Sequence, residues 1–486
     1  MLAQYPHGAL IEVAGSALAQ VATSILQSLP AQHAQHRHPG VLGLVGPGHN
    51  GKDTVVCLRH LRRTGWWCTS LEGLDTHALA ALPSQLPDTG LVIDGWLGIG
   101  RSRPLAAALC KAIAVLAAWQ EASPGERSIL AVDLPSGLDP DRGVGDPVAV
   151  PATATLALLA PARGLFTPTG RRFAGEVLLA PLVDAQPPDP DHRLIRGVEE
   201  FVDLGRDQRP RNAHKGMLGD VVLVGGAEGT EGAVVLAAEG ALALSPGKVH
   251  VLARSSAVRL PSQLMRRDRA WLRAHLERSE SDRLVIGIGC GLGQDEEAQE
   301  LLEHVLAGAQ DKVLDADALN LLARRHGALE RLAARPAAHH PRGGGGARVV
   351  LTPHPLEAAR LLGISREEVE SDRHAAAEIL ARKSRASVIL KGAGTLVASP
   401  EGGCDIVDIA APALAQAGSG DVLTGVLCAL LALHPGLEVH RLALAAATLH
   451  AHAAQRWTLR TGMLAGLSVH ALGAEISAAY ADFGRG

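Results

Sequence analysis

Ala417-Gly418-Ser419-Gly420-Asp421 runs directly into the apolar stretch 422–431, and this segment decides the fold of the second half of the chain. Small residues before a long apolar run predict a tight turn that opens a buried helix, and His434-Pro435-Gly436 predicts its end. The free N–H groups and positive dipole of such a helix start form an anion site. A carboxylate there would repel phosphate. Asp421 is therefore predicted either to cap the helix or to take a proton from a hydroxyl that attacks a bound phosphoryl group.

The composition predicts a globular protein with more than one core. At 486 residues, two or three domains are expected. A net charge of −4 excludes the electrostatic footprint of a nucleic-acid-binding protein or of one bound to an anionic membrane. The six cysteines form no CxxC pair and no metal-ligand spacing, which favours a reducing compartment. Because the sequence also shows neither a signal peptide nor an apolar run of about 18 residues, we expect a soluble, cytoplasmic protein with no membrane or nucleic-acid partner.

Three acidic residues in the first half follow predicted buried strands. Residues 41–45 lead into Gly46-Pro47-Gly48-His49-Asn50-Gly51, which matches the G-x-G-x-x-G dinucleotide fingerprint and is followed closely by Asp53. Asp94 and Asp133 end two further apolar runs. Strands that alternate with helical stretches predict a parallel sheet, whose ligands bind beyond the carboxyl ends of the strands. Asp53, Asp94 and Asp133 are therefore expected to converge on one crevice, although each alone would also suit a turn or cap.

The second half repeats the alternation of strands and helices. The Pro-rich stretch 181–191 predicts a domain boundary. Apolar runs at 220–224, 283–288, 349–351 and 388–390 predict strands, and His354 and Lys391 follow the last two of them. The histidine-rich stretch 31–39 and the glycine-rich stretch 335–346 are predicted to be surface loops rather than metal or phosphate sites.

Four motifs of the second half occur in an order that resembles a known family. They are Asp315-Ala316-Asp317, Thr352-Pro353-His354-Pro355, Lys391-Gly392-Ala393-Gly394-Thr395 and Gly418-Ser419-Gly420-Asp421. Together they resemble the ribokinase-like ADP-dependent NAD(P)H-hydrate dehydratases. The first half, with residues 46–53, 94–100 and Asp133-Leu134-Pro135-Ser136-Gly137, is similar to the NAD(P)H-hydrate epimerase that is usually fused to them.

The resemblance covers nearly the whole chain and implies an α/β protein of two domains. Residues 1–190 would form a Rossmann-like three-layer α/β/α epimerase domain, and residues 191–486 a ribokinase-like α/β dehydratase domain. The first would interconvert the R and S hydrates of NADH and NADPH. The second would dehydrate the S hydrate with ADP as co-substrate and Mg²⁺ on the phosphates, releasing AMP and phosphate. The small-molecule partners would be these hydrates and ADP, and the protein would be a homo-oligomer.

In the dehydratase, the resemblance makes Asp421 the catalytic base and a hydrate ligand. The residues that it implies for ADP are Lys391, Gly392, Ala393, Gly394, Thr395, Gly418, Ser419 and Gly420. The other residues that it implies for the hydrate pocket are Ala233, Gly291, Gly293 and His354.

In the epimerase, the resemblance makes Asp133 the acid/base and a substrate ligand. The other implied substrate residues are His49, Asn50, Gly51, Lys52, Asp53, Gly98, Ile99 and Gly100. Asn50, Asp94 and Ser136 would bind K⁺ through their oxygen atoms.

The chain departs from the family pattern at several positions. Its substrate loop reads His49-Asn50-Gly51-Lys52-Asp53-Thr54, where the family has Asn-Asn-Gly-Gly-Asp-Gly, and Cys290 takes the place of a turn proline. The ammonium of Lys52 would either weaken K⁺ binding by like-charge repulsion or point into solvent.

Two other classes of enzyme remain open at this point. A vitamin-type kinase on the same scaffold, with a non-catalytic N-terminal nucleotide-binding domain, is the main alternative. A dinucleotide-dependent dehydrogenase is the other, with Glu72 as the ribose-binding acid. Asp53 lies where the pyrophosphate of the dinucleotide would be expected, and its negative charge counts against a dehydrogenase.

Overall fold

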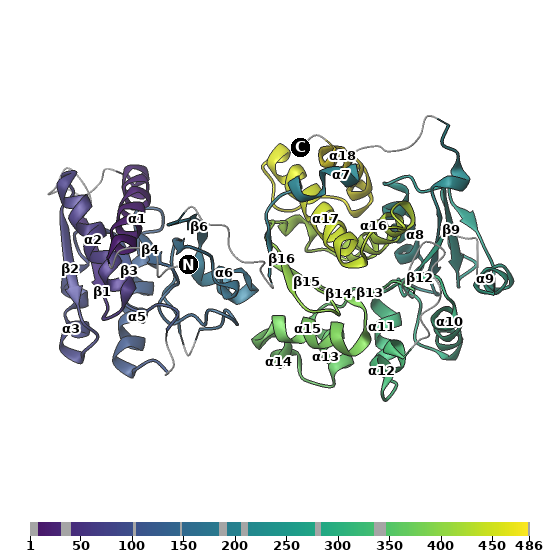
Figure 1. Ribbon diagram of the computed structural model, residues 1–486, viewed down its shortest axis with the longest axis horizontal. Coiled ribbons are helices and arrows are strands. Elements are labelled where there is room, and N and C mark those ends of the chain that lie inside the picture. The colour runs from purple at the N-terminus through teal and green to yellow at the C-terminus, as the bar shows by residue number, and fades with distance from the viewer. Residues whose placement is uncertain are drawn as a thin grey trace. The chain divides into compact units, whose positions relative to one another are not determined.

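The computed structural model describes residues 8–30, 40–100, 104–145, 148–183, 192–205, 212–277, 283–334 and 347–484 (Figure 1). The chain divides into two compact units, residues 1–188 and 189–486. The predicted loops at 31–39 and 335–346 lie outside the described residues, as do residues 184–191 of the predicted boundary.

The first unit contains a parallel sheet (purple to blue in Figure 1). Within the described residues its six strands have the order β2-β1-β3-β4-β5-β6. The strands are β1 (Gly40–Val45), β2 (Cys68–Glu72), β3 (Thr89–Gly95), β4 (Ser128–Val132), β5 (Ala154–Leu158) and β6 (Glu176–Ala180). The chain adds β2 on one side of β1 and β3 on the other, so the strand order reverses between β1 and β3. In such a sheet the ligand crevice lies at the carboxyl ends of the two strands where the order reverses.

Helices cover both faces of this sheet. They are α1 (Ala9–Ser28), α2 (His49–Arg63), α3 (Thr76–Ala80), α4 (Leu82–Gln85), α5 (Ala107–Glu121) and α6 (Pro168–Ala174). Alternate residues of β1 and β3 enter two different apolar clusters, one with α1 and α2 and the other with α3, α4 and α5. The predicted three-layer α/β/α arrangement is confirmed.

The apolar helix α1 is, among the described residues, the one helix whose length and composition would also suit a membrane span. Core helices of globular units pass the same test. Leu18, Ala22 and Leu26 of α1 are almost fully buried and pack with α2 and the sheet. The helix therefore behaves as part of the core.

Two glycines bring α2 close to the end of the sheet. A Cβ on Gly46 would lie 1.8 Å from the carbonyl oxygen of Trp96, and one on Gly51 would lie 2.0 Å from the carbonyl oxygen of Gly46. The G-x-G-x-x-G spacing therefore allows the first turn of α2 to pack directly on the loop that follows β3.

The second unit contains a larger, mixed sheet. Within the described residues its ten strands have the order β10-β9-β8-β11-β12-β13-β14-β15-β16-β7. The strands are β7 (Leu194–Ile195), β8 (Asp220–Gly225), β9 (Lys248–Ala253), β10 (Met265–Arg266), β11 (Leu284–Ile288), β12 (Asp311–Leu314), β13 (Val349–Leu351), β14 (Ser387–Leu390), β15 (Thr395–Ala398) and β16 (Cys404–Val407). The pairs β14–β15 and β15–β16 are antiparallel and the others are parallel. The order reverses between β8 and β11, which places the expected crevice at the carboxyl ends of these two strands.

The helix predicted from the apolar stretch is the centre of this unit. It is α16 (Ser419–Leu433), and its residues from Val422 to Ala432 are all buried. A Cβ on Gly425 would lie 1.7 Å from the carbonyl oxygen of Ala237, so α16 crosses α8 in close backbone contact. The other helices are α7 (Val202–Gly205), α8 (Glu231–Leu242), α9 (Arg269–Leu276), α10 (Glu296–Ala307), α11 (Ala316–Ala323), α12 (Ala328–Ala333), α13 (Pro355–Leu362), α14 (Arg366–Ser371), α15 (Arg373–Ser384), α17 (Val439–Thr461) and α18 (Val469–Phe483).

Candidate active sites

The start of α16 has the geometry of an anion site. Gly418 is the N-cap residue, with φ of +89°, a left-handed conformation that glycine adopts without strain. The Ser419 hydroxyl donates to the carbonyl oxygens of Leu414 (2.9 Å) and Gln416 (3.1 Å), which fixes the turn. The helix is 15 residues long, so its first N–H groups carry the positive end of a substantial dipole.

Asp421 lies in the first turn of α16 but does not cap it. Gly418 is the N-cap residue of α16, and Asp421 lies three residues after it. The capping interpretation of Asp421 is therefore wrong, and its carboxylate is left for other chemistry.

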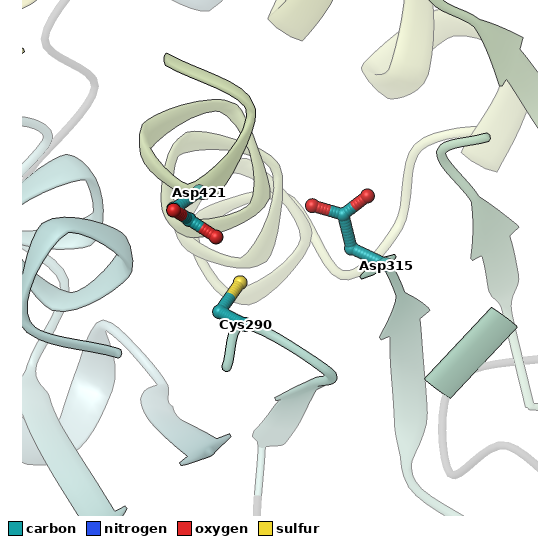
Figure 2. Close-up of side chains that lie close together, drawn as sticks. All are labelled: Cys290, Asp315 and Asp421. Atoms are coloured by element: carbon teal, nitrogen blue, oxygen red, sulfur yellow. The ribbon is translucent and has the colours of Figure 1, made fainter. Parts of the chain in front are cut away.

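A compact polar cluster surrounds this carboxylate (Figure 2). Cys290 follows β11 and Asp315 follows β12. The Cys290 sulfur and one carboxylate oxygen each of Asp315 and Asp421 all lie within 4.8 Å of one another. Asp315 accepts hydrogen bonds from Lys391 Nζ (2.7 Å) and Thr424 Oγ1 (2.9 Å). The loops after three strands and one face of α16 thus meet at one point, as the switch-point rule predicts.

Burial and charge set the protonation states in this cluster. Burial, with the negative charge of Asp315, raises the pKa of Asp421 to about 6, so at neutral pH Asp421 is ionised and poised to accept a proton. Burial alone would lower the pKa of Lys391. The charges of Asp315 and Glu357 outweigh that effect and raise it, which keeps the ammonium charged.

The predicted ADP residues meet at the same point. A Cβ on Gly420 would lie 3.3 Å from Lys391 Nζ, so the ammonium lies against the first turn of α16. Two hydrogen bonds hold the loop that begins at Lys391. The guanidinium of Arg373 donates to the Lys391 carbonyl oxygen (3.2 Å), and the Thr395 hydroxyl donates to the Gly392 carbonyl oxygen (2.9 Å). Ala393 is exposed and Gly394 is buried in this loop.

Three of the predicted hydrate residues lie in a loop after β11 and in the first turn of α8. Ala233 is in the first turn of α8, beside Thr230, whose hydroxyl donates to the Gly291 carbonyl oxygen (3.1 Å). The Gly293 N–H donates to Asp317 Oδ2 (2.9 Å). The second acid of the Asp315-Ala316-Asp317 motif therefore positions the glycine loop.

His354, the fourth predicted hydrate residue, is the N-cap of α13. Its Nδ1 accepts from the N–H groups of Leu356 (3.1 Å) and Glu357 (3.3 Å), and Glu357 Oε2 accepts from the His354 N–H (2.8 Å). Burial and the charge of Lys391 lower the pKa of His354. A neutral imidazole whose Nδ1 is an acceptor carries its proton on Nε2, and this nitrogen lies 3.3 Å from Glu357 Oε1. His354 is therefore not a base.

Sequence reasoning missed Thr424, Glu357 and Arg254. Thr424 is three residues after Asp421, so helical spacing would have placed it on the same face. Arg254 follows β9 directly and donates to the Leu292 carbonyl oxygen (2.7 Å), which supports the glycine loop. The pattern of a strand followed by a charged residue would have found it.

In the first unit, Asn50 ties α2 to the sheet. Its Nδ2 donates to the carbonyl oxygens of Val132 (2.6 Å) and Leu97 (3.1 Å). A Cβ on Gly98 would lie 2.8 Å from Asn50 Oδ1. The start of α2 therefore contacts the loops after both β3 and β4. Gly98 is half-buried and Ile99 and Gly100 are exposed in the first of these loops.

Asp94 and Ser136 form a buried pair beside Asn50. Asp94 Oδ1 accepts from Ser136 Oγ (2.7 Å) and Oδ2 from Ser136 N (2.8 Å), while Ser136 Oγ accepts from Leu97 N (2.9 Å). Burial raises the pKa of Asp94 to about 6, and no cationic side chain of the described residues contributes to it. The predicted K⁺ ligands thus lie together around a carboxylate that lacks a countercharge.

Asp53 and Asp133 act on one another. Asp53 is one helical turn after Asn50, and Asp133 directly follows the Val132 carbonyl that Asn50 holds. Burial and the charge of Asp133 raise the pKa of Asp53 to about 7, against a smaller opposite effect of Lys52. Burial also raises the pKa of Asp133, although the Leu158 N–H donates to its Oδ1 (3.0 Å). With a pKa of about 7, Asp53 is present in both its protonated and its ionised form at neutral pH.

The backbone of Asp133 is held in an unusual conformation. Its φ is +66°, a left-handed value that costs a non-glycine residue free energy and that recurs at functional sites. His49 and Lys52, by contrast, are exposed on α2. The exposure of Lys52 favours the solvent-facing alternative over repulsion of K⁺.

Known proteins resemble both units. A family model described as NAD(P)H-hydrate dehydratase matches residues 221–477, and one described as YjeF-related protein N-terminus matches residues 7–80 and 69–164. The chain is 32% identical over 446 residues to the bifunctional NAD(P)H-hydrate repair enzyme Nnr of Coxiella burnetii, which covers 85% of this chain and 84% of that protein. It is also 32% identical over 414 residues to the Escherichia coli protein of the same name, covering 80% of this chain and 76% of that one.

A solved structure resembles the second unit. It is the ADP/ATP-dependent NAD(P)H-hydrate dehydratase of Bacillus subtilis, co-crystallised with ATP and Mg²⁺. The two are 28% identical with a TM-score of 0.50, over 60% of this chain and 99% of that one.

Proposed function

Because the chain belongs to the bifunctional NAD(P)H-hydrate repair enzymes, we propose that residues 1–190 hold its epimerase site and residues 191–486 its ADP-dependent dehydratase site. The enzyme repairs hydrated NADH and NADPH through an isomerase and a lyase activity. The vitamin-type kinase and the dehydrogenase that the sequence left open do not describe this family. The observation that carries the dehydratase assignment is the ionised, non-capping Asp421 at the anion-binding start of α16.

In the dehydratase, Asp421 takes the proton of the hydrate's hydroxyl group, and the oxygen attacks the terminal phosphate of ADP. AMP leaves, and elimination of phosphate together with a proton from the neighbouring ring carbon then restores NADH or NADPH. Lys391, which lies against Gly420, is placed to neutralise charge on the transferred phosphoryl group, and the N–H groups of α16 bind its oxygens. We also place His354 among the residues that line the hydrate pocket. Bound Mg²⁺ would neutralise further charge on the phosphates.

In the epimerase, Asp53 and Asp133 supply the acid and the base. Inversion at the carbon that bears the hydroxyl needs one group that gives a proton and one that takes a proton. Two coupled carboxyl groups that hold one proton between them meet this need at neutral pH. Asp53, which the family resemblance implies only as a substrate residue, thereby becomes a proton-transfer residue in this proposal.

K⁺ fits the oxygen ligands proposed for it. Asp94 is fully buried, no cationic side chain of the described residues contributes to its pKa, and Ser136 is hydrogen-bonded to it. Asn50 and Ser136 both bond to the backbone of Leu97. A bound monovalent cation would supply the missing positive charge. It would also fix the positions of the loops after β3 and β4 relative to the start of α2. We also expect the enzyme to form a homo-oligomer.

The dehydratase assignment is tested with purified S hydrate. We expect the absorbance of the reduced nicotinamide to recover when both ADP and Mg²⁺ are present and to stay flat when ADP is omitted. Recovery without a nucleotide would show that the start of α16 does not bind a co-substrate.

Lys52→Gly separates the two roles considered for this lysine. Since Lys52 is exposed and lowers the pKa of Asp53, its loss is expected to move the alkaline limb of epimerisation to higher pH. The dependence on K⁺ is expected to stay the same. Both are measured as rates with pure R hydrate at constant ionic strength. A steeper dependence on K⁺ in the variant would show instead that the ammonium reaches the cation.

A further inference from the structure

Cys290 is held in place by its backbone. The Gly226 N–H donates to the Cys290 carbonyl oxygen (3.0 Å), and a Cβ on Gly225 would lie 2.1 Å from that oxygen. The residue is only 2% exposed. Its side chain points between Asp421 and Asp315 (Figure 2), with the sulfur within 4.8 Å of a carboxylate oxygen of each.

The hydrogen bonds around Cys290 decide where its thiol hydrogen goes. Both oxygens of Asp315 already have donors, Oδ1 from Lys391 and Oδ2 from Thr424. The Thr424 hydroxyl also hydrogen-bonds Cys290, but its one hydrogen goes to Asp315. The thiol of Cys290 makes a side-chain hydrogen bond with the Asp421 carboxylate.

The thiol stays protonated in this place. Burial raises the pKa of Cys290 well above its usual range, and the charges of Asp421 and Asp315 raise it further. Cys290 is therefore a neutral hydrogen-bond donor at physiological pH and a poor nucleophile.

We propose that Cys290 is a positioning residue for dehydration, which orients the Asp421 carboxylate through its S–H group and stabilises the ionised form. This inference rests on the dehydratase activity proposed above. The other charged groups that act on Asp421 are Asp315 and Asp317, which disfavour its ionisation, and Lys391, which favours it. All of them are unchanged when only Cys290 is replaced.

The test compares Cys290→Ala and Cys290→Ser with the control Cys428→Ala. Cys428 is also fully buried and lies on α16 itself, but it acts on none of the acidic residues. We expect the acid limb of kcat/KM for S hydrate to shift to higher pH by roughly 0.5 to 1 unit in Cys290→Ala. Cys290→Ser keeps a hydrogen-bond donor, so its acid limb should lie close to that of the wild type. Cys428→Ala should leave the acid limb where it is in the wild type. A uniform loss of activity at every pH, with the limb unmoved, would overturn the proposal.

A second measurement separates this proposal from the activity on which it rests. ADP affinity is measured by calorimetry against pH with no hydrate present, because ionised Asp421 repels the phosphates. The midpoint of this dependence is expected to rise in Cys290→Ala even if the wild type proved inactive as a dehydratase. Identical midpoints in the wild type and the variant would overturn the role of Cys290, whatever the activity.

Discussion

Asp421→Asn is expected to lower ADP-dependent dehydration of S hydrate by roughly 100- to 10,000-fold, the usual effect of losing a general base. The amide cannot take a proton from the hydroxyl. ADP binding should stay intact or tighten slightly, because a negative charge that faces phosphate is removed. Turnover is measured from the recovery of reduced-nicotinamide absorbance, and ADP affinity by calorimetry.

The control for Asp421→Asn is Asp268→Asn. Asp268 caps α9 by accepting from the Trp271 N–H (2.8 Å), a role that asparagine also performs. Asp421→Asn with more than a tenth of wild-type turnover would contradict the role of Asp421. In the wild type, kcat/KM is expected to rise with pH through about 6, because the base must be ionised and burial raises the pKa of Asp421 to about 6.

Asp53→Asn and Asp133→Asn are each expected to lower epimerisation of R hydrate by roughly 100- to 10,000-fold while sparing dehydration of S hydrate. Asparagine suits the test at Asp133, since it tolerates the left-handed φ of +66° there better than most residues. The wild-type rate should be bell-shaped in pH, because one carboxyl must be protonated and the other ionised. With the pKa of Asp53 at about 7, the rate should fall above about pH 7.

Asp75→Asn is the control within the same unit. Asp75 caps α3 by accepting from the N–H groups of His77 and Ala78, and asparagine keeps that role. Its epimerisation rate should equal that of the wild type. If dehydration of pure S hydrate falls in parallel with epimerisation in Asp53→Asn or Asp133→Asn, the two sites are not separate.

The parallel parts of both sheets could be predicted from the sequence because each of their main strands is a short apolar run followed by a charged or glycine-rich turn. The edge of the second sheet could not. β7 has only two residues, Leu194–Ile195, and it pairs with Ile406 and Val407 more than two hundred positions later. Nothing local in such a short segment specifies a strand, so long-range pairing decides it.

The candidate sites show the same division. Asp421 and Asp133 could be singled out because turn residues and apolar runs mark the ends of elements. The interactions that set their chemistry join distant residues, as when Lys391 and Thr424 both donate to Asp315. The pairing of Asp53 with Asp133 likewise depends on α2 packing over the end of β4. Sequence spacing alone therefore identified the carboxylates but not which of them share a proton.

A mixture of R and S hydrate shows directly whether one chain carries both repair activities. With ADP and Mg²⁺ present, we expect reduced-nicotinamide absorbance to recover beyond the amount of S hydrate supplied, because R hydrate is converted and then dehydrated. Without ADP, no recovery is expected. Recovery that stops at the S fraction at a rate no faster than spontaneous epimerisation, or recovery that does not require ADP, would show that the chain does not carry both activities.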